Sequence, residues 1–210
     1  MTIKKLFTRY LFTIMGLGCF VWVGWALAKE AGLTGSRADR IERKLEQVLR
    51  EYSPGPEDAN TWVVIYKYEV NHTQRCRTDA AIYPSGVVPL VSGCASTNKD
   101  SRKAILKNHR LGRGTVLQVG DPEVKGDLAD VWDRYGLIGT ANYPIYLGNE
   151  LWGYVGLSFT EDNMRVMIGG ELASEDVSAR RTKELLARPL ANAVERYYRL
   201  NPGDIDVELY

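Results

Sequence analysis

The feature that most constrains this chain is an uncharged apolar stretch near its N-terminus, residues 10–28. These nineteen residues, YLFTIMGLGCFVWVGWALA, contain no Asp, Glu, Lys or Arg, and a helix needs about 20 such residues to cross a bilayer. Three cations precede the stretch, Lys4, Lys5 and Arg9, and no acidic residue does. The pattern therefore predicts a single membrane-spanning helix, with residues 1–9 in the cytoplasm and everything after the span on the outer side.

Two other interpretations of this stretch remain open. Ala26-Leu27-Ala28 has the small-x-small form of a signal-peptide cleavage site, so the rest of the chain could be released after Ala28. A lipoprotein signal ending at Cys19 is a poorer fit, because nine apolar or small residues follow that cysteine. A retained span is favoured over cleavage, since the stretch is longer than the ~7–15 residues of a usual signal core.

The composition of the span supports an anchoring role. Trp and Tyr are enriched at the two membrane interfaces. The stretch carries such aromatic residues at Tyr10, Trp22 and Trp25. Small residues let membrane helices approach closely, which would allow packing with copies of the same chain, and they are Gly16, Gly18, Gly24 and Ala28.

The remainder of the chain has the length of one domain. About 180 residues follow the span, which suits a single core. We expect a linker over residues 29–35, one domain over residues 36–200 and a flexible tail over residues 201–210. Subtracting the three N-terminal cations from the 27 basic residues leaves 24 against 26 acidic ones. That net charge of −2 argues against a nucleic-acid partner, which usually requires a strongly basic domain.

The order of expected elements indicates an α+β domain. Helices are predicted at 36–52, 97–109, 127–135 and 174–200, the last kinked by Pro189. Strands are predicted at 61–70, around 80–83 and 87–91, at 115–119 and at 165–168. The strongest strand signal is a hairpin over residues 140–160 that turns at Gly148-Asn149. An antiparallel sheet with helices on one face follows, an arrangement analogous to PAS- and GAF-like sensor folds.

Two cysteines follow the span. Cys76 and Cys94 would lie in an oxidising compartment if the topology is right, so a disulfide between them is expected. The alternative is a pair of buried, unbonded thiols.

Binding features are few, and catalytic ones are fewer. A basic cluster within twelve residues has two interpretations, a solvated helix face or a site for an acidic partner or lipid headgroups, and it comprises Arg102, Lys103, Lys107, Arg110 and Arg113. Aromatic residues of the hairpin favour sheet packing over a ligand platform, and they are Tyr143, Tyr146, Trp152 and Tyr154. Only two histidines occur and no nucleotide-binding or nucleophile motif is present. We therefore expect no enzyme activity, metal or cofactor.

Part of the chain resembles a known family. The segment NYPIYLGNELWGYVGLSFTEDN followed by RTKELLARPLANAVERYY is similar to the hairpin and closing helix of T-even-type phage holins. The resemblance implies a protein that accumulates in the host inner membrane, self-associates in the lipid bilayer and opens lesions that release endolysin. It also implies a periplasmic domain that receives an antiholin. The alternative expectation is a membrane-tethered periplasmic sensing or binding module with a PAS/GAF-like domain, acting through a partner protein.

Overall fold

The computed structural model describes one α+β domain, the one predicted to follow the apolar stretch. The described residues are 35–53, 62–69, 71–83, 93–98, 100–122, 124–125, 127–161 and 182–209. The predicted span at 10–28 and the predicted strands at 87–91 and 165–168 lie outside them. Among the described residues, no helix has both the length and the apolar composition needed to cross a membrane.

A six-stranded antiparallel sheet forms the centre of the domain. Its strand order is β3-β2-β1-β6-β5-β4, and every neighbouring pair runs antiparallel. The predicted hairpin is its best-formed part, pairing from Gly139 with Phe159 to Leu147 with Glu150. Gly148 turns the chain there at a φ of 68°, which glycine adopts without strain. The strands are β1 (Trp62–Glu69), β2 (Gln74–Ile82), β3 (Gly93–Ser96), β4 (Thr115–Gln118), β5 (Gly139–Leu147) and β6 (Glu150–Phe159).

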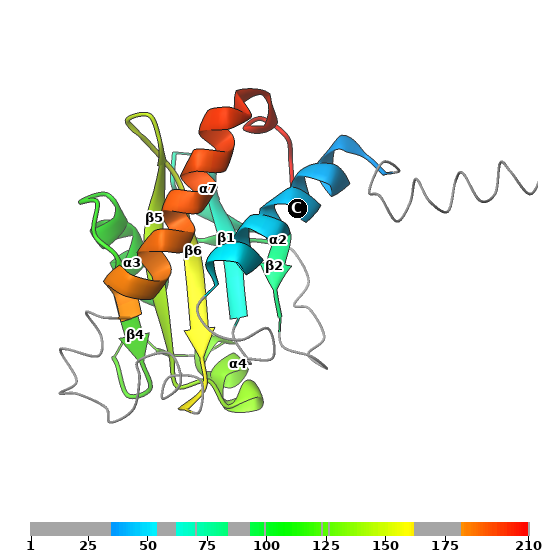
Figure 1. The fold of residues 1–210 in the computed structure, drawn as a ribbon. Helices are drawn as coiled ribbons and strands as arrows, with labels where there is room; N and C mark the ends of the chain where they lie inside the picture. Colours follow the sequence, from blue (N-terminus) through cyan, green and yellow to red (C-terminus); the bar gives the residue numbers. More distant parts are fainter. Residues whose placement is uncertain are drawn as a thin grey trace, which may run out of the picture.

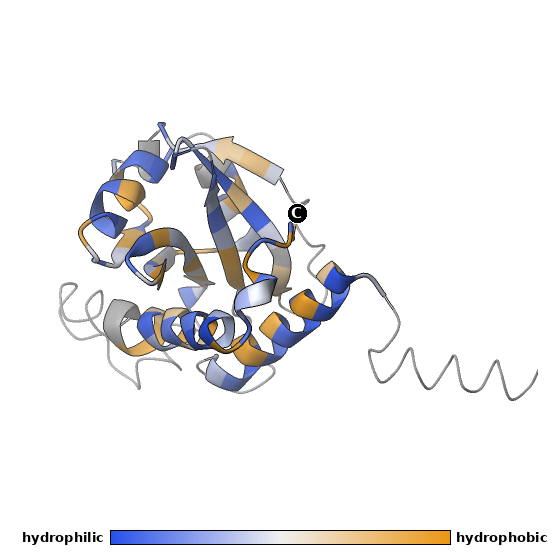
Figure 2. Ribbon diagram, turned by 90° about the horizontal axis from the view of Figure 1, so that it is seen from above, coloured by the Kyte–Doolittle hydropathy of each residue, from blue (hydrophilic) through white to orange (hydrophobic). Residues whose placement is uncertain are grey.

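Two long helices cover one face of the sheet, α2 (Arg37–Tyr52) and α7 (Arg188–Leu200). Figure 1 shows both helices crossing in front of the strands, and Figure 2 shows hydrophobic and hydrophilic residues alternating along them. Their apolar sides meet the alternate residues of β1 and β6 that point to this face. The fully buried members of this main core include Leu45, Leu49, Val63, Ile65, Val155, Leu157, Leu190 and Val194.

The starts of these helices follow from local sequence. Ser36 begins α2 with a capping box, because the Asp39 amide donates to Ser36 Oγ at 3.1 Å and the Ser36 amide donates to Asp39 Oδ2 at 2.6 Å. A π-helical turn, η1 (Thr182–Ala187), precedes α7. Pro189 lies in the first turn of α7, directly after η1. The helix thus changes from π to α geometry at the proline, whose missing N–H cannot donate to the preceding turn.

The C-terminal segment packs back onto the domain, although the sequence predicts a flexible tail there. A short 3-10 helix, η2 (Pro202–Asp204), turns the chain, and Leu209 is only 3% exposed within the main core. Asp204 holds this turn in place, since it pairs with Arg37 at 3.1 Å and accepts a 2.8 Å hydrogen bond from the Tyr197 hydroxyl. Ile205 and Val207 pack against the same core, so the alternation of Ile205, Val207 and Leu209 with acidic residues was a signal of one buried face that the prediction of a flexible tail did not use.

The opposite face of the sheet is covered by α3 (Asp100–His109) and α4 (Asp127–Tyr135). Ile105 of α3 and Trp132 of α4 pack there with Trp62, Tyr68 and Tyr154. Since successive strand residues point to opposite faces, this second core shares no residue with the one under α2 and α7. The predicted antiparallel α+β class is right, but helices cover both faces of the sheet and not one.

Candidate functional site

A cavity of about 300 Å³ lies between the sheet and the pair α3 and α4. This volume is at the lower end of the range usual for small-molecule sites. All six strands of the sheet contribute residues to one wall, and helices α3 and α4 supply the other. The described lining residues are Trp62, Val64, Tyr66, Arg75, Arg77, Gly93, Ala95, Arg102, Ile105, Leu117, Val131, Trp132, Leu137, Thr140, Asn142, Tyr154, Gly156 and Ser158.

Arg75 is the main polar group of this cavity. Its guanidinium donates to the Tyr154 hydroxyl and lies 4.4 Å from the centre of the Tyr66 ring. Its Nε is buried and has no hydrogen-bond partner among the described residues. A cation–π contact offsets about 2 kcal/mol when desolvated, which is less than the usual penalty for burying an unpaired charge. Burial disfavours the charged form of Arg75, but Tyr154 and Tyr66 raise its pKa above the ordinary value, so the guanidinium stays charged while its Nε has no acceptor among the described residues.

The phenol that contacts Arg75 does not neutralise it. Burial raises the pKa of Tyr154 above its ordinary value, against the lowering effect of the Arg75 charge. The Tyr154 hydroxyl therefore remains protonated at neutral pH. Tyr154 also stacks on Tyr66, its partner on the neighbouring strand, with ring centres 4.7 Å apart, so the two rings lie side by side on the cavity face of the sheet.

Two further arginines line the same cavity. Arg77 follows Arg75 by two residues on β2, so both side chains leave the same face of the sheet. Arg102 comes from α3 and donates from Nη1 to the Ser96 carbonyl at 3.2 Å. No Asp or Glu occurs among the described lining residues. The cavity is consequently cationic over the part that the structure describes.

Smaller polar groups line the β5–β6 side of the cavity. Asn142 is 3% exposed, and its Nδ2 has no partner among the described residues. Gly156 has no side chain that would crowd Asn142. A Cβ at this position would lie only 3.1 Å from Asn142 Oδ1 and 3.2 Å from Tyr66 Cε2. A buried amide N–H without an acceptor costs free energy. The β5–β6 side of the cavity therefore also contains a donor, Asn142 Nδ2, that no described residue satisfies.

A buried histidine fixes the end of α3 next to this cavity. His109 Nδ1 lies 2.9 Å from the Tyr68 hydroxyl, and the Tyr146 hydroxyl donates to the His109 carbonyl. Burial lowers the pKa of His109 to about 3, so the imidazole is neutral at physiological pH. His109 does not line the cavity, and its contacts serve to hold α3 on the sheet. In the part of the chain that the structure describes, no group of three metal-ligating side chains exists.

The predicted basic cluster separates into two parts. Arg102 points into the cavity, while the other four side chains are exposed along and after α3, namely Lys103, Lys107, Arg110 and Arg113. The aromatic hairpin divides as well, since Tyr154 lines the cavity and Trp152 packs against Tyr198 on the opposite face, with ring centres 4.9 Å apart. The predicted span residues, from Tyr10 to Ala28, lie outside the described residues.

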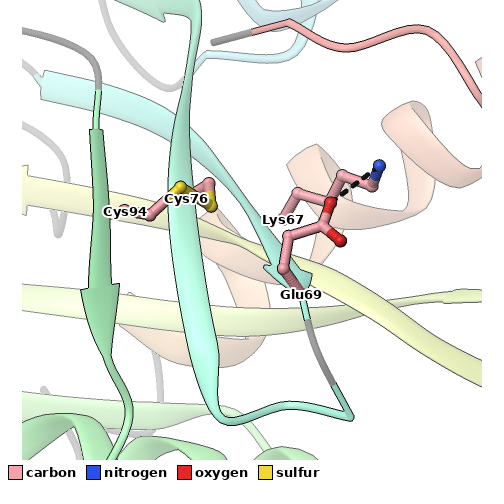
Figure 3. Close-up of a disulfide and its surroundings, with 4 residues drawn as sticks. All are labelled: Lys67, Glu69, Cys76 and Cys94. Carbon is pink, nitrogen blue, oxygen red and sulfur yellow. Dashed lines mark ion pairs between the residues drawn. A yellow bond between two sulfur atoms is a disulfide. The ribbon is translucent and has the colours of Figure 1, made fainter.

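The two cysteines of the domain form a disulfide, Cys76–Cys94. Figure 3 shows it joining β2 to the edge strand β3, where the two residues are direct cross-strand partners. The residues on either side of each cysteine point the other way and line the cavity, namely Arg75, Arg77, Gly93 and Ala95. The disulfide therefore secures the strand pair that forms one rim of the cavity.

Sequence reasoning missed Arg75, Arg77 and Asn142. A signal was available in the alternation Arg75-Cys76-Arg77, since two cations flanking a buried cysteine in a strand must share the opposite face. No comparable signal existed for Asn142, whose neighbours in the cavity come from distant parts of the chain.

No family model matches this chain, and no curated protein matches it. Among solved structures, it is similar to a red/green cyanobacteriochrome in its red-light-absorbing state, with 12% identity, a TM-score of 0.48, and coverage of 79% of this chain and 98% of the other. It is also similar to the GAF domain of a two-component sensor histidine kinase from Bacillus halodurans (12% identity, TM-score 0.45, 78% and 97% covered). A GAF domain/HD domain protein from Geobacter sulfurreducens gives 14% identity and a TM-score of 0.48, with 78% and 95% covered.

The domain thus has an α+β fold, with an antiparallel sheet covered by helices. The expected membership of the T-even-type phage holins is wrong, because no holin family model and no curated holin matches this chain and the similar structures named above are a cyanobacteriochrome and GAF-domain proteins. The physical reason for the error is that an aromatic hairpin followed by an amphipathic helix is a common unit of antiparallel sheets. The described residues of the quoted segments lie mostly in β5, β6, η1 and α7, elements that pack together in the core of the domain.

Proposed function

We propose that this protein is a sensing or binding module that takes a small organic ligand into the cavity between the sheet and helices α3 and α4. The observation that carries the proposal is the pair of buried, unpartnered donors, Arg75 Nε and Asn142 Nδ2, which line one cavity. Folded proteins rarely leave such groups unsatisfied without a functional reason. Aromatic and aliphatic walls with a few polar groups are also the usual composition of a ligand site.

We further propose that residues 10–28 tether this module to a membrane, with the GAF-like domain on the outer side. The uncharged stretch and its positive flank support that topology, and the Cys76–Cys94 disulfide is typical of an oxidising compartment. Alkaline extraction of membranes tests it together with protease digestion of intact spheroplasts. The protein should stay in the pellet and the domain should be digested; a soluble or protected domain contradicts the tether.

Ligand binding is tested by thermal unfolding of the full-length protein against a panel of small anionic, neutral and cationic compounds. A ligand at 100 times its Kd stabilises the folded state by about 2.7 kcal/mol, which corresponds to a rise in Tm of roughly 5–10 °C for a domain of this size. We expect at least one compound to give such a shift. If no compound in the panel raises Tm, the proposed function is wrong.

The location of binding is tested with a variant that fills the cavity. Ala95 lines the cavity from the edge strand β3, so Ala95→Trp should weaken binding of the stabilising compound at least tenfold by calorimetry. Asn192→Trp adds the same ring on the exposed side of α7 and should leave binding unchanged. Equal binding by the wild type and Ala95→Trp would place the ligand elsewhere and contradict the proposal.

A further inference from the structure

We propose that the ligand of this cavity is a small organic oxyanion, with a planar apolar body and a second polar atom at its far end. This inference rests on the proposed function and names the ligand class of the same site. It follows from three features of the cavity walls, which are the placement of the arginines, the aromatic surface between the strands and the unpartnered amide.

The arginines define where the anionic group binds. Arg75 and Arg102 come from different elements, β2 and α3, yet the charges of both act on the Tyr154 hydroxyl. All three arginines line this one cavity, with Arg77 on the same strand face as Arg75. A guanidinium presents its N–H donors in a planar fork that matches a carboxylate or phosphate.

The anion would complete contacts that the protein leaves open. Arg75 Nε has no partner among the described residues, and the groups that the guanidinium does contact, Tyr154 and Tyr66, carry no carboxylate. No described lining residue carries a negative charge. An incoming oxyanion would supply both the missing acceptor and the missing charge, whereas a cation would be repelled and a neutral compound would supply only the acceptor.

The rest of the cavity selects the body of the ligand. Trp62, Tyr66 and Trp132 present ring surfaces and Leu117 and Leu137 present aliphatic ones, so a planar apolar group fits between them. Asn142 lies on β5, three strands away from Arg75 on β2. Its free Nδ2–H would donate to an oxygen at the end of the ligand opposite the anionic group. The volume of about 300 Å³ limits the ligand to a single small ring system.

The test uses 4-hydroxybenzoate as the probe, measured by calorimetry on the full-length protein. Its neutral isostere 4-hydroxybenzamide reports the contribution of the charge, and phenyl phosphate distinguishes a phosphate from a carboxylate as the preferred oxyanion. We expect 4-hydroxybenzoate or phenyl phosphate to bind at least tenfold more tightly than the amide. Whichever binds more tightly identifies the preferred group.

Arg75→Gln should remove the preference for the anionic probes over 4-hydroxybenzamide. Binding of the amide should stay within about twofold of wild type, which would show that the cavity of the variant is intact. Arg113→Gln removes an exposed arginine beyond α3 and should change neither affinity. If Arg75→Gln disrupts folding, Arg77→Gln and Arg102→Gln, tested in the same way, should each reduce the anion preference.

Two results would overturn the inference. Equal binding of the amide and the anions, lost together in Ala95→Trp, would keep the ligand-binding function and refute the oxyanion class. Binding of the anions that is unaffected by all three arginine substitutions would show that the anion is not held by these side chains. Failure of every compound in the thermal panel described above would instead refute the proposed function itself.

Discussion

Opening the Cys76–Cys94 disulfide should destabilise the domain and weaken the cavity together. The bond closes a loop with a sequence separation of 18, and the chain-entropy relation gives about 3 kcal/mol for a loop of this length. Cys94 is exposed while Cys76 is buried, so a reductant has access to the bond from the β3 side. Cys94→Ser removes the bond and leaves the buried residue in place.

The loss of stability is measured by urea unfolding of the wild type, with and without reductant, and of Cys94→Ser. Taking a urea m-value near 2 kcal/mol/M, a loss of about 3 kcal/mol lowers the midpoint by about 1.5 M. Reduced wild type and Cys94→Ser should show the same midpoint, and the reductant should not change the variant further. That last comparison isolates the bond from other effects of the reductant.

The coupling to the cavity gives the stricter part of this prediction. Both cysteines have neighbours that line the cavity, so freeing β3 should loosen the rim formed by Arg75, Arg77 and Ala95. Without urea, where the protein is fully folded in both redox states, we expect the ligand found in the thermal panel to bind several-fold more weakly to the reduced protein than to the oxidised protein. A midpoint shift below about 0.5 M, or identical affinity in the two redox states, would refute the reasoning that this bond supports the site.

Three other perturbations test separate parts of the structure. Gly153→Ala should prevent stable folding, because its Cβ would lie 2.2 Å from the Tyr66 carbonyl oxygen of the neighbouring strand; a variant that unfolds in urea like the wild type would contradict that close approach. Lowering the pH from 7.5 to 5 should reduce the free energy of unfolding by about 2 kcal/mol, because burial lowers the pKa of His109 to about 3 and only the unfolded chain takes up the proton. His109→Gln should abolish this part of the pH dependence, and the same dependence in that variant would assign it to other groups. Ser36→Ala should lower stability by about 1 kcal/mol, because it removes the capping box of α2; no change in the urea midpoint would show that the cap is not formed in solution.

The sequence predicts the elements of this domain better than its site. Strong local signals located α2, the β5–β6 hairpin and α4, because amphipathic periodicity and a Gly148-Asn149 turn act over short distances. The α+β class with an antiparallel sheet followed from their order. The second helical layer did not, since the short helices α3 and α4 carry no signal for which face of the sheet they cover.

The cavity could not be predicted because its residues come together only in the folded sheet. Arg75 on β2, Arg102 on α3 and Asn142 on β5 are joined by the strand order β3-β2-β1-β6-β5-β4, which places the N-terminal strand β1 beside β6. The basic cluster was predicted as one set of residues, yet Arg102 lines the cavity whereas Arg113 is exposed to solvent. The holin resemblance came from the hairpin and last helix, whose residues mainly build the core.

The most direct test of the central claim is a ¹H–¹⁵N spectrum of the tryptophan indoles during titration with 4-hydroxybenzoate. Trp62 and Trp132 line the cavity, whereas Trp152 packs against Tyr198 on the face covered by α7. The account predicts saturable shifts of the Trp62 and Trp132 resonances and an unchanged Trp152 resonance, and Ala95→Trp should abolish those shifts. Shifts confined to Trp152, or no saturable shift of Trp62 and Trp132 with this probe or with the ligand found in the thermal panel, would contradict a ligand site in this cavity.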